Sequence, residues 1–254
     1  MTLSYLNLLA GLLLLVIPGY LLYAYDRLTL KKAVIALVRM GTQMAVLGAC
    51  LWLLYKFDSV WLNLLWLAIL VVAAAFLMVS RIDIRRVFVP ACAAMFTSVL
   101  AVSAYMLFVV LRPDAPLSAR WAVPVTGVLM AHVLTTNIHA VRTYFDCLRQ
   151  DSQAYYTLLG NGATRLQALA PYITRAIKSL TVPAMASLSV MGLFLMPMLL
   201  SGLLIGGLEP IAAVTLFVLF IIGALAASML SLVLTLWFSD RQVFNRHGQL
   251  KPDI

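Results

Sequence analysis

Long apolar stretches, separated by short charged segments, make up almost the whole chain. Seven of them have about 20 residues or more, the length that an α-helix needs to cross the hydrocarbon core of a bilayer. They lack the alternation of barrel strands, and backbone groups in lipid need internal partners, so the pattern predicts helices. The predicted spans are residues 6–25, 33–55, 60–80, 87–111, 121 to about 139, 180–206 and 210–238.

Composition excludes an ordinary soluble domain. Hydrophobic residues make up 64% of the chain and charged residues 11%, whereas a soluble domain has about 45–50% and about 25%. The net charge is +9, and in so apolar a chain the basic residues are expected in loops beside lipid headgroups rather than at a nucleic-acid-binding surface. Cys50 and Cys92 fall in apolar runs and Cys147 in a basic segment, which predicts three free thiols. The prediction is an all-α, polytopic integral membrane protein with a single transmembrane domain over residues 1–254.

Basic residues indicate the orientation. With seven spans, 14 of the 18 Lys and Arg residues fall on one side and three on the other, while Arg39 lies within a span. Because basic loops face the cytoplasm, we expect the N-terminus outside and a short C-terminal tail, residues 239–254, in the cytoplasm. No Lys or Arg precedes the first run, the reverse of a cleavable signal peptide, so this run is expected to remain as an anchor.

The longest connection, at about residues 142–179, is expected on the cytoplasmic side as a helix, a sharp turn and a second helix. Gly162 can adopt a left-handed turn conformation, Thr164 is a plausible N-cap, and Gln167 stands at the N3 position of a capping box. An apolar stripe follows at helical spacing: Leu166, Leu169, Ala170 and Ile173. These residues fit equally well a helix on the membrane surface and a helix that docks a partner.

The sequence carries no motif of an enzyme site. It has no GxxxxGK[ST] phosphate loop, no HExxH, no CxxC and no GxSxG. We therefore expect a chain that is not an enzyme, binds no cofactor and does not hydrolyse ATP alone. All the acidic residues fall outside the predicted spans, which counts against a proton- or sodium-coupled transporter.

Polar residues do occur inside two predicted spans. Arg39 and Gln43 are one helical turn apart in the second span, where Arg39 either reaches back to the headgroups or faces a polar passage with Gln43. In the fifth span, His132, Thr135 and His139 form one stripe, which is expected to line a passage rather than face lipid. His132 could also be a hydrogen-bonded interhelical donor or a metal ligand. The two imidazoles lie about 10 Å apart along one helix, too far to bind the same ion.

The last two spans contain methionines and small residues. His132 with Met196 and Met198, on either side of Pro197, are the candidate metal ligands, although methionine is also ordinary core packing. Close helix packing, within one chain or across a dimer, is expected at small residues with four-residue spacing. These residues are Gly202 and Gly206, followed by Gly223, Ala227 and Ser231.

Four stretches together resemble the FetB-type ABC transporter permeases, a family of bacterial iron-export permeases similar to plant proteins associated with aluminium tolerance. In order, they are LVRMGTQMAVLGACLWLLYKF (37–57), VPVTGVLMAH (123–132), GATRLQALAPYITRAIKSLTVPAMAS (162–187) and MGLFLMPMLLSGLLIGGLEP (191–210). The resemblance spans about residues 30–245, and the third and fourth stretches are the most specific.

The resemblance implies a permease subunit, a homodimer in the bacterial inner membrane, with two copies of a separate cytosolic ABC ATPase that bind ATP and Mg. The implied ATPase-coupling residues are Gly162, Ala163, Thr164, Arg165, Leu166, Gln167, Ala168 and Leu169. The implied translocation path contains Arg39, Gln43, His132, Thr135, His139 and Pro197.

The chain departs from the family where a substrate would pass. Met198 replaces a glycine of the sixth span, Phe217 a glutamine of the last span and His132 an asparagine of the fifth. The leading hypothesis is an ATP-driven exporter of a metal ion such as iron. The alternatives are a stand-alone secondary transporter or channel, an ABC permease for a non-metal small molecule, and a membrane scaffold that transports nothing.

Overall fold

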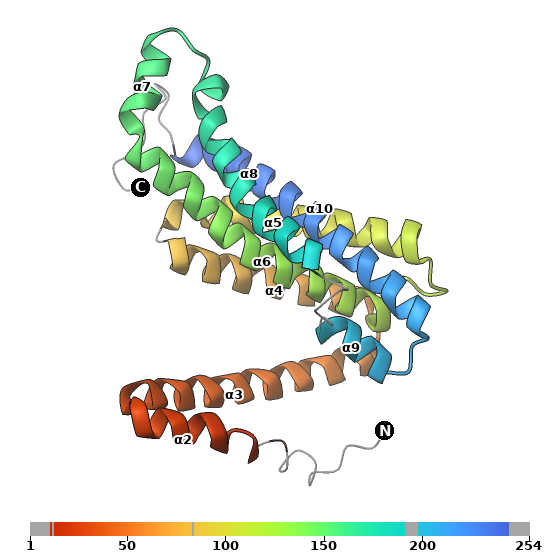
Figure 1. The fold of residues 1–254 in the computed structure, drawn as a ribbon. Helices are drawn as coiled ribbons and strands as arrows, with labels where there is room; N and C mark the ends of the chain where they lie inside the picture. The colour runs from red at the N-terminus through yellow and green to blue at the C-terminus, as the bar shows by residue number, and fades with distance from the viewer. Residues whose placement is uncertain (1–10, 12, 83, 191–197, 244–254) are drawn as a thin grey trace. The chain divides into compact units, whose positions relative to one another are not determined.

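A computed structural model describes residues 11, 13–82, 84–190 and 198–243. Within these ranges the regular structure is helical, as predicted, and Cys50, Cys92 and Cys147 are free thiols. The chain divides into two compact units, Met1–Phe57 and Asp58–Ile254, and the single transmembrane domain stays a prediction. Figure 1 shows the helices of both units.

The first unit is a helical hairpin. Helix α2, Val16–Tyr25, is followed by α3, Arg27–Phe57, with Asp26 between them. The Asp26 carboxylate accepts hydrogen bonds from the Thr29 hydroxyl and from the backbone N–H groups of Thr29 and Leu28, at 3.1 and 3.0 Å. The Thr29 hydroxyl, followed by these N–H groups, lowers the pKa of Asp26. Asp26 thus acts as an N-cap for α3.

The second unit is built around four long helices, whose apolar faces form the core. α10 packs against α5 and α6, and α4 packs against the same two helices. Met95, Leu129, Phe145 and Leu232 are almost fully buried between them. The helices are α4 (Val60–Ile82), α5 (Phe88–Tyr105), α6 (Ala119–Gln150) and α10 (Pro210–Val243), with short helical segments η1 (Arg85–Val87) and η2 (Met106–Leu111).

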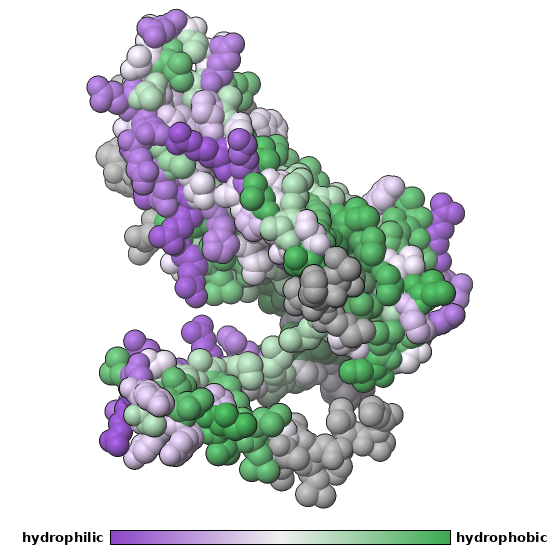
Figure 2. Space-filling model, in the orientation of Figure 1, coloured by the Kyte–Doolittle hydropathy of each residue, from purple (hydrophilic) through white to green (hydrophobic). Residues whose placement is uncertain are grey.

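A helical hairpin projects from this unit (Figure 1). It is formed by the end of α6, by α7 (Ser152–Gly160) and by the start of α8 (Arg165–Val190), and α9 (Met198–Ile205) follows later in the chain. The second helix predicted within residues 142–179 is longer than expected, because α8 has 26 residues and continues to Val190, inside the sixth predicted span. Hydrophilic side chains gather over this hairpin, whereas hydrophobic ones cover much of the visible surface of α10 (Figure 2).

Five helices in the described part of the chain are long and apolar enough to cross a membrane. They correspond to the second, third, fourth, fifth and seventh predicted spans: Arg27–Phe57, Val60–Ile82, Phe88–Leu111, Ala119–Gln150 and Pro210–Asp240. The other two predicted spans, 6–25 and 180–206, include residues 6–10, 12 and 191–197, which lie outside the described ranges. Seven spans with an external N-terminus thus stay a prediction.

Small residues on α10 allow close packing inside one chain. A Cβ atom on Gly223 would lie 2.5 Å from Met106 Sδ, and Ala227 is completely buried. Ser231 is also buried and accepts a hydrogen bond of 2.7 Å from Asn137 Nδ2 on α6. By contrast, Gly202 on α9 is exposed, with open space where a Cβ would lie. Of the two predicted small-residue stripes, the one on α10 therefore packs within the chain.

Candidate functional site

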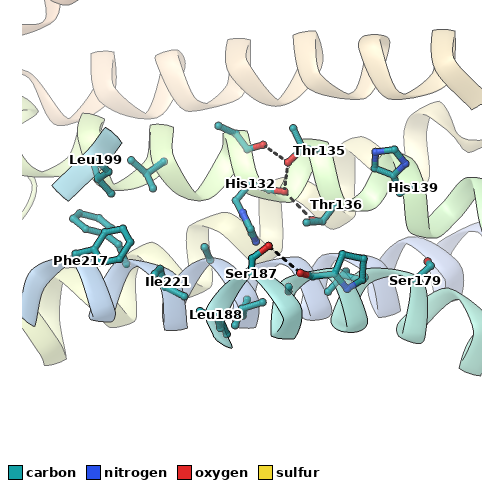
Figure 3. Close-up of a pocket in the computed structure, with 18 of the residues that line it drawn as sticks. His132, Thr135, Thr136, His139, Ser179, Ser187, Leu188, Leu199, Phe217 and Ile221 are labelled. Carbon is teal, nitrogen blue, oxygen red and sulfur yellow. Dashed lines mark hydrogen bonds between the residues drawn. The ribbon is translucent and has the colours of Figure 1, made fainter. Parts of the chain in front are cut away.

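A cavity of about 960 Å³ lies between α6, α8, α9 and α10 of the second unit. His132, Thr135 and His139, predicted from their spacing to share one stripe, all line it, together with Thr136 and Thr143 of the same helix. Ser179 and Ser187 of α8 and Phe217 and Ile221 of α10 form other parts of the wall (Figure 3). The sequence stripe on the fifth span therefore faces a cavity.

Most hydroxyl groups of the cavity donate their hydrogen to their own helix. Thr135 donates to the carbonyl of Ala131 or His132, at 3.1 and 3.0 Å, and Thr136 donates to His132 at 2.8 Å. Ser187 donates to the Pro183 carbonyl at 3.0 Å (Figure 3). Each oxygen keeps lone pairs, so these hydroxyls offer acceptors rather than donors to a molecule in the cavity.

The imidazole of His132 is the cavity's unsatisfied polar group. Its Nε2 atom is buried and has no hydrogen-bond partner among the described residues. Leaving such a group unpaired typically costs about 1–3 kcal/mol. The interpretation of His132 as a hydrogen-bonded interhelical donor thus lacks a partner among the described residues. His139, one of the two exposed residues of the predicted stripe, lies farther along the same wall.

Of the remaining predicted path and metal residues, only Met198 is a described residue of the second unit. Arg39 and Gln43 are exposed residues of α3, in the first unit. Met198 is 91% exposed and is not part of the wall. Met196 and Pro197 lie outside the described residues. The described residues also contain no cluster of three or more His, Cys, Asp or Glu side chains that could hold a metal ion.

The turn between α7 and α8 has the local geometry that the sequence predicts. Gly162 has a φ of +85°, in the left-handed region that favours glycine. The Thr164 N–H donates to Gln167 Oε1 at 2.9 Å, and the Gln167 N–H donates to Thr164 Oγ1 at 3.4 Å. This reciprocal pair is a capping box, and it starts α8 at Arg165.

The apolar residues after the turn divide between surface and core. Leu166 is 75% exposed, whereas Leu169 is only 4% exposed and belongs to the hydrophobic core, next to the fully buried Ala168. A partner can therefore contact Leu166 but not Leu169 without moving the helix. The period of the sequence placed both on one face, but it could not show that the α8 face bearing Leu169 packs against the rest of the chain.

Ion pairs attach the start of α8 to neighbouring helices. The Arg165 guanidinium contacts the Asp240 carboxylate of α10 at 2.7 Å and its carbonyl at 3.1 Å. Arg175 pairs with Asp151 at 2.8 Å, and this hydrogen bond is the first cause of a raised pKa of Arg175. The Tyr172 hydroxyl donates to the Asp151 carbonyl at 3.0 Å. These partners are 21 to 75 residues apart in the chain, so sequence patterns did not reveal them.

The helices and the cavity between them define a multi-pass membrane protein. Residues 5–244 match the family described as "Uncharacterised protein family (UPF0014)", and the chain belongs to this family. The resemblance to FetB-type permeases is thereby confirmed. No solved structure matches the chain.

Three relatives illustrate the family. "UPF0014 membrane protein slr1647" of Synechocystis sp. is 29% identical over 82% of this chain and 81% of its own length. "Probable iron export permease protein FetB" of Escherichia coli is 24% identical over 95% of this chain and 93% of its own. "Protein ALUMINUM SENSITIVE 3" of Arabidopsis thaliana is 25% identical over 62% of this chain and 58% of its own.

Proposed function

We propose that this chain is the membrane subunit of an ATP-driven ABC exporter in the bacterial inner membrane. In this proposal it forms a homodimer, and a separate cytosolic ATPase, also in two copies, binds ATP and Mg. The observation that carries the proposal is the capped turn at residues 161–164, which presents exposed Leu166 at the start of the helix that also lines the cavity.

Helix α8 connects the proposed docking turn directly to the cavity. Leu166 lies at its first turn, and Ser179, Pro183 and Ser187 reach the cavity wall. At 1.5 Å per residue, Leu166 and Pro183 are about 25 Å apart along the helix. A movement of the turn by the ATPase would thus reach the cavity through a single element. Pro171 and Pro183 each remove one backbone hydrogen bond of α8, so bending is expected there.

The Escherichia coli relative "Probable iron export permease protein FetB" supports a metal ion such as iron as the cargo. His132, Thr135 and His139 would then line the path. A second candidate is export of a non-metal small molecule, which is favoured by the absence of a three-ligand metal cluster in the described residues. A stand-alone channel or secondary transporter would not need the exposed turn to fit a partner.

Capture of the ATPase tests the proposal. Leu166→Asp places a charge in the proposed apolar contact, which costs a few kcal/mol when unpaired and weakens binding about a hundredfold. Membrane insertion should be unaffected because Leu166 is exposed. The partner used is a candidate ABC nucleotide-binding subunit from the same organism, and its recovery with the purified tagged chain is measured.

Two control variants make the result specific. Leu166→Met keeps an apolar contact and should retain the ATPase. Gln153→Asp adds the same charge to an exposed residue of α7, away from the proposed contact, and should also retain it. Undiminished recovery of the ATPase with Leu166→Asp would refute docking through this turn and favour a helix on the membrane surface.

A further inference from the structure

The wall of the cavity is chiefly apolar and has one polar row. Leu180 and Leu188 of α8 and Phe217, Phe220 and Ile221 of α10 contribute hydrophobic surface. The polar row on α6 is formed by His132, Thr135, Thr136, His139 and Thr143. An apolar cavity of several hundred Å³ with a few polar groups is typical of sites for drug-sized organic molecules.

The polar groups do not suit a bare metal ion. None of the described lining residues is Asp, Glu, Cys, Lys or Arg. Hard cations need several oxygen ligands with negative charge, and softer ones need clustered imidazoles or thiolates. The two imidazoles are seven positions apart on one helix, or about 10 Å along its axis. The same absence of charge on the wall disfavours a strongly charged organic ion.

An acyl chain does not fit the polar row either. A lipid tail offers no hydrogen-bonding group to the polar row, in which the buried His132 Nε2 atom already has no partner among the described residues. The oxygens of Thr135, Thr136 and Ser187 likewise offer acceptors, since their hydrogens already bind carbonyls of the same helix. A fitting occupant therefore has an apolar body and at least one hydrogen-bonding group.

We propose that this cavity binds a neutral or weakly charged amphipathic organic molecule, hydrogen-bonded to the polar row on α6 that includes His132, and that it admits a metal only inside such a molecule, as a neutral chelate. This inference takes the cavity to be the path of the proposed exporter and specifies the class of its cargo. A free organic compound and a neutral metal chelate can both combine an apolar body with a hydrogen-bonding group.

Equilibrium binding to the purified full chain in nanodiscs, without any ATPase, tests the inference. The probes are 8-hydroxyquinoline, its neutral tris complex with Fe³⁺, and Fe²⁺ alone. We expect at least one organic probe to bind, and His132→Phe to weaken it about tenfold through loss of a buried hydrogen bond. Comparison of the two organic probes shows whether the free compound or the chelate is preferred.

Matched variants on α8 separate cavity binding from partition into lipid. Ala184 lines the cavity, whereas Ala186, two residues away, is exposed and does not. Ala184→Trp should abolish saturable binding, and Ala186→Trp should leave it unchanged. Leu188→Trp fills the same cavity and replaces Ala184→Trp if that variant does not fold, as judged by size-exclusion chromatography and thermal unfolding.

Three outcomes would overturn the inference. In the first, the organic probes bind equally well to the Ala184→Trp and Ala186→Trp variants, or bind to neither variant. In the second, Fe²⁺ alone binds and its binding depends on His132. In the third, oleate displaces the organic probe and His132→Phe has no effect on binding. The last outcome would identify a lipid groove. Since the assay contains no ATPase, these failures are distinct from a failure of the ATPase to bind.

Discussion

At the scale of single residues, Gly162 controls how the chain leaves α7. Its φ of +85° is in a region that side chains with a Cβ rarely adopt, whereas Gly160, two residues earlier, ends α7 with a helical backbone. Neither glycine has an atom near the position of an added Cβ, so the backbone alone distinguishes them. The capping box then fixes the start of α8.

Replacement of Gly162 by Val should oppose the turn by about 1–2 kcal/mol and displace Leu166 from its contact. We expect normal membrane insertion but reduced capture of the ATPase. Gly160→Val is the matched control and should capture it normally. Equal capture by both variants would show that the left-handed turn is unimportant for docking.

Local sequence signals predicted this turn because each of its backbone and capping hydrogen bonds joins residues no more than five positions apart. Gly162, Thr164 and Gln167 form a short pattern with a direct physical meaning. The burial of Leu169 and the partners of Arg165 depend on segments far away in the chain, so no local pattern could give them. His132 was identified from periodicity, but the lack of a partner for Nε2 emerged only from the packing of α6, α8 and α10.

At the scale of helices, the pair of Arg165 and Asp240 links the docking turn to α10. Both side chains are about one-third exposed, so the pair is partly screened and contributes about 1 kcal/mol. Its position matters more than its energy, because α8 and α10 both line the cavity. The pair is therefore placed to make the two helices move together when the turn is pushed.

Loss of this pair should uncouple ATP hydrolysis from transport more than it weakens assembly. Asp240→Asn should still capture the ATPase but reduce transport per ATP hydrolysed. The exchanged variant, Arg165→Asp with Asp240→Arg, tests whether a charge pair at this position suffices, and it should recover part of the transport. Coupling ratios in proteoliposomes that are unchanged by Asp240→Asn would contradict the role assigned to the pair.

At the scale of the whole molecule, the question is which end of the second unit faces the cytoplasm, and the prediction rests on the distribution of basic residues. In the second unit, the starts of α4 and α6 lie together, since Asn63 donates to the Leu117 carbonyl at 2.9 Å. Arg165 and Asp240 join the start of α8 to the end of α10. Hydrophilic side chains gather over the hairpin of α6, α7 and α8 (Figure 2). We expect this hairpin to face the cytoplasm.

Reporter fusions test this orientation. A cytoplasmic reporter after Ile254 should be active, and one inserted at Asp114, in the segment between η2 and α6, should be inactive. Reversed activities would contradict the external N-terminus. Activity at both positions would contradict the arrangement of the spans, and the docking turn would have to be reassigned.

The most direct test of the proposed function is ATP hydrolysis by the purified chain with and without a candidate ABC nucleotide-binding subunit from the same organism. The chain lacks a phosphate loop, so the account predicts a homodimer with no ATP turnover alone and activity that appears only in the assembled complex. Significant ATP turnover by this chain alone, or no association with that subunit at any concentration, would contradict it.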